Sequence, residues 1–197
     1  MPKVTEEYRV SKRAEITSAA MRAFRRKGFH ATSMADIITE SGLSAGAIYG
    51  HFGGKNDIVL EVASRVIDAR IGKVEELSSA RPLPAPAELL RLLASGLAHD
   101  LGRPAMLVQL WGEAVTEPAL RALWGLLVGR LRAAYCSYLS LWHQSEHGAT
   151  VADADRLAAE QVVLFLSCAQ GYILQSALVT EFDGEAFLRS MELHLPR

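Results

Sequence analysis

The segment GHFGGK, residues 50–55, has the glycines and the lysine of a phosphate-binding loop. In nucleotide hydrolases that loop reads G-x-x-x-x-G-K-S/T and lies between a strand and a helix. In this chain Tyr49 stands five residues before Gly54, Asn56 follows Lys55, and no strand pattern precedes the segment. The spacing therefore argues against nucleotide hydrolysis, and the lysine needs another explanation.

A second chemical pattern, HQSEH, matches the H-x-x-E-H signature of one class of zinc peptidases. His143 and His147 fall on one helix face at i and i+4, as metal ligation requires. Gly148 follows at once and indicates a helix end, where the helix dipole also favours histidine. Since no third ligand stands in a matching context, we expect no metal and no cofactor. A zinc-dependent hydrolase using His143, Glu146 and His147 is the alternative function.

Charge is distributed unevenly along the 197 residues. Residues 1–60 contain nine Lys and Arg against six Asp and Glu, a net +3, and residues 61–197 contain twelve against sixteen, a net −4. A basic head on an acidic body indicates that only the head meets a polyanion. The N-terminal residues are charged throughout and no apolar run of eighteen residues occurs. We therefore expect a cytoplasmic protein with no membrane partner.

Apolar residues recur with a helical period, and sustained strand alternation is absent from the sequence, which predicts an all-α fold. Ile16, Ala20 and Phe24 define one face of a first helix at about 11–27, and Gly28 ends it. A proline-rich stretch at 78–90 marks the clearest linker. Longer helices are predicted at about 85–101, 105–115, 118–146, 153–180 and 184–195.

Two short helices with a tight turn between them precede that linker. The residues that punctuate them are Ser33 and Asp36, which predict a capping box, then Gly42, the cap Ser44, and the pair Gly53-Gly54. Ile48 and Phe52 would share one face of the second of these helices, and a further helix follows the glycine pair. The arrangement is a helix-turn-helix, whose second helix can enter a DNA major groove.

The second of these helices carries small side chains and then hydrogen-bond donors. Small residues let the backbone approach the bases, and an alanine methyl can contact the methyl group of thymine. The small residues are Ala45, Gly46 and Ala47, and the donors that can reach phosphates are Tyr49, His51 and Lys55. Tyr49 could instead be a core aromatic, and Lys55 could instead belong to a solvated face.

The run RAEITSAAMRAFRRKGFHATSMADIITESGLSAGAIYGHFGGKNDIV resembles the DNA-binding domain of the TetR family of transcriptional regulators. The resemblance implies a three-helix DNA-binding head at 1–60 and a helical-bundle body at 61–197 that binds an effector and dimerises. It implies phosphate contacts from Ser33, Ser44, Tyr49, His51 and Lys55, and base contacts from Ala45, Gly46 and Ala47. Family members often carry a basic residue in place of Ala45 and threonine in place of Ala47, so this head should depend more on phosphates.

The body offers an effector pocket and a dimer surface. Apolar and aromatic residues at helical spacing, with a few polar groups, suit a largely hydrophobic ligand, although such stripes also form ordinary cores. The candidates are Met106, Gln109, Glu113, Trp124, Tyr135, Tyr138, Phe165 and Cys168. Small residues in the last long helix and apolar residues after it could form a two-fold helical bundle or pack within one chain. These are Ser167, Gly171, Ser176, Phe187, Met191 and Leu195.

Taken together, the residues and the resemblance predict a homodimeric repressor, not an enzyme. It would bind a palindromic double-stranded DNA operator and be released by a small hydrophobic effector. A ligand sensor with a weakened DNA-binding head is a further alternative, because the segment SAGA, residues 44–47, offers few hydrogen-bonding side chains.

Overall fold

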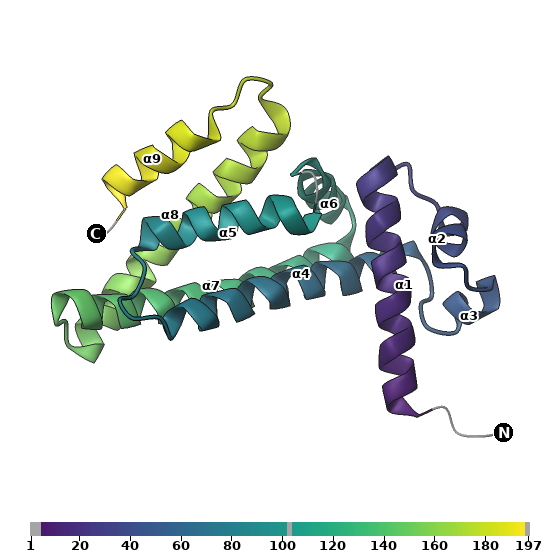
Figure 1. The fold of residues 1–197 in the computed structure, drawn as a ribbon, viewed down its shortest axis with the longest axis horizontal. Helices are drawn as coiled ribbons and strands as arrows, with labels where there is room; N and C mark the ends of the chain where they lie inside the picture. Colours follow the sequence, from purple (N-terminus) through teal and green to yellow (C-terminus); the bar gives the residue numbers. More distant parts are fainter. Residues whose placement is uncertain (1–4, 102–103, 196–197) are drawn as a thin grey trace.

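The computed structural model describes residues 5–101 and 104–195. Within those ranges the chain forms nine helices and no strand, which confirms the all-α prediction. The helices are α1 (Glu6–Lys27), α2 (Met34–Ser41), α3 (Ala45–Tyr49), α4 (Lys55–Ser78), α5 (Pro86–Leu101), α6 (Ala105–Thr116), α7 (Pro118–His147), α8 (Val151–Leu178) and α9 (Gly184–His194). Figure 1 shows α1, α2 and α3 gathered at one end of the molecule, with α4 and α7 extending away from them side by side.

The ends of the first two helices follow their capping residues. Thr5 caps α1, so this helix begins several residues before the predicted position 11, and Gly28 ends it at a φ of 81°. The predicted capping box of α2 is confirmed: the Ser33 hydroxyl accepts from the Asp36 amide, and the Asp36 carboxylate accepts from the Ser33 amide. Gly42 then turns the chain in the left-handed region, at a φ of 67°, where a side chain would be strained.

The third helix is shorter than the sequence suggested. α3 ends at Tyr49, and Gly50 caps it, so that the predicted helical position of Phe52 lies in the following turn. The Phe52 amide still donates to the Ile48 carbonyl at 3.0 Å, and the Phe52 ring is buried. The glycines that follow α3 are poor helix formers, which explains the early end.

Two hydrophobic clusters hold the molecule together. The first joins α1, α2, α3 and the N-terminal half of α4 and includes Met106 and Leu107 of α6. The second contains the end of α4 with α5, α7, α8 and Leu195, which follows α9. The expected domain boundary at residue 60 falls inside α4, which is one continuous helix. Both α4 and α6 therefore belong to the head and to the body.

The body is built around the hairpin of α7 and α8, two long helices that pack along each other and are joined by the turn at Gly148. By length and composition alone, α8 could also cross a membrane, and only 17% of its most apolar stretch is buried. One such helix is weak evidence for a membrane span. Polar residues such as Gln161 and Gln170 interrupt its apolar run, so the helix contains no continuous apolar run of eighteen residues.

Candidate DNA-binding face and effector cavity

The helix-turn-helix presents α3 to solvent. Ala45, Gly46 and Ala47 are exposed, while Ile48 on the opposite face is completely buried. The Ser44 hydroxyl accepts from the Ala47 amide at 3.2 Å, so this side chain already caps the helix. The slim leading turn of α3 is thus free of large side chains, as the sequence indicated.

Tyr49 and His51 follow at the end of α3. The Tyr49 side chain is half exposed, which favours the surface interpretation over the core one. His51 is partly buried, and its carbonyl accepts from Arg13 Nη1 at 2.7 Å. Arg13 also lies over the Phe52 ring, 4.2 Å from its centre, and so fixes this turn against α1.

Ion pairs at both ends of α2 tie this helix to the C-terminal part of α1. Lys27 pairs with Asp36, while Arg22 and Arg26 both bind Glu40. The hydrogen bond from Lys27 and those from Ser33 lower the pKa of Asp36 well below its usual range. The exposed Ser33 hydroxyl therefore lies beside a carboxylate whose charged form is favoured by these hydrogen bonds.

Lys55 lies where the head meets the body. Its Nζ donates to the carbonyl of Phe29 at 2.6 Å and to that of His30 at 3.4 Å, and it sits 4.2 Å from the centre of the Phe29 ring. Partial burial lowers the pKa of this ammonium group, against the attraction of Glu113. The lysine therefore anchors the turn between α1 and α2, and a phosphate contact from it stays a prediction.

The same turn is held from the body by α6. Gln109 Oε1 accepts from the Phe29 amide at 2.9 Å, and Glu113 Oε1 lies 2.8 Å from His30 Nε2. Both side chains were expected at an effector pocket, but the structure turns them toward the head. Spacing of i and i+4 could show that they share a helix face, yet it could not show which neighbour that face meets.

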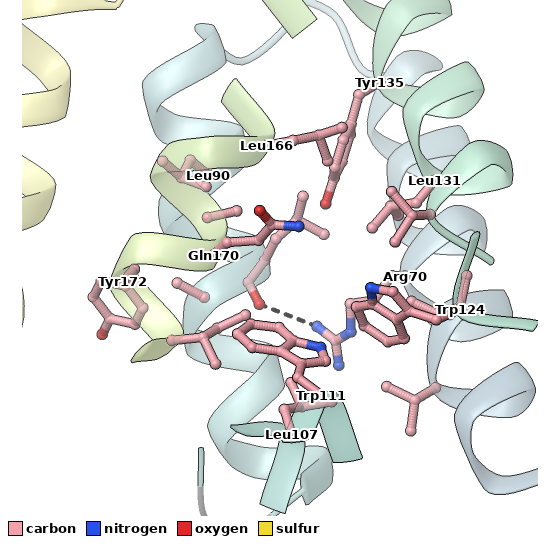
Figure 2. Close-up of a pocket in the computed structure, with 17 residues that line it drawn as sticks. Arg70, Leu90, Leu107, Trp111, Trp124, Leu131, Tyr135, Leu166, Gln170 and Tyr172 are labelled. Carbon is pink, nitrogen blue, oxygen red and sulfur yellow. Dashed lines mark hydrogen bonds between the residues drawn. The ribbon is translucent and has the colours of Figure 1, made fainter. Parts of the chain in front are cut away.

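A cavity of about 90 Å³ lies in the body among α4, α5, α6, α7 and α8. Its walls are almost entirely apolar or aromatic, and Figure 2 shows the side chains that surround it. They are Val66, Ile67, Arg70, Leu90, Leu93, Ala94, Leu107, Trp111, Trp124, Val128, Leu131, Tyr135, Leu166, Ala169, Gln170, Tyr172 and Ile173. Trp124 and Tyr135 were predicted effector contacts, and both line the cavity.

The other six predicted effector residues do not line this cavity. Gln109 and Glu113 face the head, and Met106 belongs to the hydrophobic cluster of the head. Tyr138 is buried and donates its hydroxyl proton to the Pro84 carbonyl. Phe165 packs edge-on against Tyr135 in the core, and Cys168 packs against the same cluster, where burial raises the pKa of its thiol. The core interpretation of the aromatic stripe was therefore the better one at these positions.

Arg70 is a charged cavity residue that the sequence analysis did not predict. It lies on α4, and its Nη1 donates to the Leu93 carbonyl at 3.2 Å. Burial lowers the pKa of its guanidinium, while Tyr135 acts in the opposite direction. A charged residue in the apolar face of a predicted helix, beside Val66, Ile67 and Val74, was the available signal.

Trp111 of α6 forms another part of the wall. Its ring meets the Trp124 ring edge-on with centres 5.7 Å apart. Its Nε1 is buried and has no hydrogen-bond partner in the part of the chain that the structure describes. A buried donor without an acceptor costs free energy, so this N–H group could donate a hydrogen bond to an oxygen of a bound molecule.

The HQSEH segment does not assemble a metal site. His143 is buried, with Nε2 2.7 Å from Gln161 Oε1, whereas Glu146 and His147 are exposed at the end of α7. Among the side chains that the structure describes, no group of three or more His, Cys, Asp or Glu could hold a metal ion. The i and i+4 spacing of the histidines is real, but it serves ring packing with Trp142.

Residues 16–62 match the family model described as bacterial regulatory proteins of the tetR family. The uncharacterised HTH-type transcriptional regulator YfiR of Bacillus subtilis is 36% identical over 75 residues, covering 38% of this chain and 37% of YfiR. Residues 16–62 therefore form a DNA-binding domain of the TetR type. The alignment with YfiR thus spans little more than a third of either protein.

Solved structures extend the likeness to the whole fold. A transcriptional regulator of Saccharomonospora viridis in complex with choline has a TM-score of 0.68 and 24% identity, over 95% of this chain and 100% of that one. The regulator FadR of Bacillus subtilis in complex with stearoyl-CoA has a TM-score of 0.59 and 22% identity, over 91% and 96%. These similarities show that head and body share the fold of these regulators. None of the comparisons supports a hydrolase.

The body of the chain also exposes an apolar stripe along α8. Val163, Leu164, Leu174 and Leu178 are between 42% and 67% exposed, at helical spacing. Ser167 is exposed on the same stripe. Of the other residues predicted for a dimer surface, Leu195 is buried in the core of the body, and Phe187 packs edge-on against Tyr172 and Phe182. For these two, packing within the chain is the better interpretation.

Proposed function

We propose that this chain is a ligand-responsive, homodimeric repressor that binds a palindromic DNA operator and releases it when a small, largely apolar effector enters the body cavity. The head, residues 1–60, binds DNA, and the body, residues 61–197, binds the effector and the second copy of the chain. The protein acts in the cytoplasm and is not an enzyme.

The observation that carries this proposal is the position of α6. One face of this helix contributes Leu107 and Trp111 to the cavity wall. Another face contributes Gln109 and Glu113, which hold Phe29 and His30 of the head. A shift of α6 caused by an occupant of the cavity would therefore reach the turn between α1 and α2 directly.

The size of the cavity supports such a shift. Ligand sites usually have volumes of about 300 Å³ or more, whereas this cavity has about 90 Å³. An effector larger than a few atoms must therefore move the walls. The edge-on pair of Trp111 and Trp124 joins α6 to α7, and separating the two rings moves α6 relative to the long hairpin.

Two heads must act together for a palindromic operator to be read. We propose that the exposed stripe of α8 forms the two-fold contact, since an apolar patch of this kind needs a covering partner. Ser167 would let the paired helices approach closely. The structural neighbours bound to choline and to stearoyl-CoA support the idea that a TetR body holds small molecules.

The proposal is tested by selecting duplexes from a random pool with the purified chain. We expect enrichment of a partly palindromic sequence. Changing Ala47 to serine should alter which sequence is enriched, since this side chain faces the bases. Changing Lys55 to alanine should weaken binding to all sequences about equally. A pool from which no duplex is enriched would favour the ligand sensor with a weakened head.

A further inference from the structure

We infer that the cavity selects an effector with a flat apolar body and a hydrogen-bond acceptor oxygen, and that this oxygen binds Trp111 Nε1 beside the Arg70 guanidinium. The inference rests on the proposed function in one respect, since it takes the cavity to be the effector site. It adds the chemical class of the effector and the side chains that distinguish it.

The polar groups at the cavity are mainly donors. Guanidinium and indole groups donate and cannot accept, while a phenol and a primary amide can do both. Figure 2 shows the Arg70 guanidinium between the rings of Trp111 and Trp124, with the Tyr135 hydroxyl and the Gln170 amide pointing toward the same space. No aspartate or glutamate belongs to the described residues that line the cavity.

The buried Trp111 Nε1 points to the acceptor most directly. Since this atom has no hydrogen-bond partner within the described residues, its proton is removed from water without compensation. An acceptor oxygen on the ligand would satisfy it and would remove the cost of burial. A ligand that presents an ammonium group would instead place donors against the donors of Trp111 and Arg70.

The state of Tyr135 agrees with this arrangement. The tyrosine is buried, and burial raises the pKa of its hydroxyl, so the side chain is neutral at ordinary pH. A neutral hydroxyl can donate to a second lone pair on the ligand. The rest of the wall is apolar, and the aromatic rings of Trp111 and Trp124 suit a flat ligand body.

The test uses one ring system with three substituents. The full-length protein is titrated with 2-naphthamide, 2-ethylnaphthalene and 2-naphthylmethylammonium, and binding is followed by calorimetry and by the fluorescence of the tryptophans. We expect the amide to bind about tenfold more tightly than the ethyl compound, which is the usual size of one satisfied buried hydrogen bond. The ammonium compound should bind most weakly.

Two matched variants locate the effect. Trp111→Phe keeps an aromatic ring but removes the indole N–H, so we expect the difference between the amide and the ethyl compound to disappear. Trp124→Phe makes the same change on the other side of the ring pair, and there the difference should remain. Circular dichroism checks that both variants fold, and Trp111→His offers a second route, because its ring N–H can restore the preference for the amide.

The outcomes separate this inference from the proposed function. Equal affinities of the wild-type protein for the amide and the ethyl compound would overturn the inference, and so would a preference that survives in Trp111→Phe. Neither result depends on DNA. A protein that shows the expected ligand ranking but binds no duplex would uphold the inference and overturn the proposed repressor.

Discussion

Replacing Gln109 by methionine should release the turn between α1 and α2 while the two domains stay folded. The Gln109 Oε1 acceptor lies 2.9 Å from the Phe29 amide, and the contact is partly buried. Methionine has a similar shape but offers only a weak acceptor, so the amide would lose its partner. Such a loss costs about 1–2 kcal/mol, which corresponds to a five- to thirtyfold change in the local opening equilibrium.

Hydrogen exchange measured residue by residue gives the direct assay. The Phe29 amide should exchange about five- to thirtyfold faster in Gln109→Met than in the wild-type protein. The Ile37 amide, which donates to the Ser33 carbonyl inside the capping box of α2, serves as the internal control and should be unchanged. Gln109→Glu keeps an acceptor oxygen and should preserve most of the protection. Unchanged exchange at Phe29 in Gln109→Met would refute the view that α6 holds the head through this bond.

Three further outcomes follow from the contacts described above. Leu164→Glu on the exposed stripe of α8 should convert the proposed dimer to a monomer in sedimentation. Val115→Glu, at an exposed position on α6, should leave the dimer intact. A dimer that persists in Leu164→Glu would contradict the proposed interface. Phe165→Ala should lower the free energy of unfolding by about 3–5 kcal/mol in urea titrations, because the ring is buried in the core of the body, and a loss below about 1 kcal/mol would place the ring elsewhere. Asp36 has a lowered pKa in the folded head, so its contribution to stability is present above its ordinary pKa of about 4 and is lost as the pH falls further. The melting temperature of Asp36→Asn should therefore fall less steeply with pH below about pH 4 than that of the wild-type protein. An unaltered pH dependence would count against the ion pair with Lys27.

Much of the head could be predicted because its signals are local. A serine three residues before an aspartate fixes the start of α2, and a glycine with positive φ fixes the turn at Gly42. Each of these signals involves atoms close together in the sequence. The early end of α3 was harder to see, because Phe52 keeps its apolar role while leaving the helix.

The proposed effector site was harder to predict because it depends on contacts between helices distant in sequence. The predicted helix at 105–115 contains Gln109, Trp111 and Glu113, but only the packing of α6 assigns Gln109 and Glu113 to the head and Trp111 to the cavity. Arg70 escaped notice for the same reason. Its guanidinium reaches the cavity from α4, and the residues that surround it come from four other helices.

The central claim, that the head binds duplex DNA through its phosphates, is tested most directly by the salt dependence of binding. In each head Lys55 is the one predicted phosphate contact that carries a full charge, so a dimer neutralises at least two phosphates. The logarithm of the binding constant should then fall with the logarithm of the salt concentration with a slope of about −1.8 or steeper. Fluorescence anisotropy with a selected palindromic duplex should show affinity falling about twelvefold or more between about 50 and about 200 mM KCl. An affinity that does not change over this range would contradict the account.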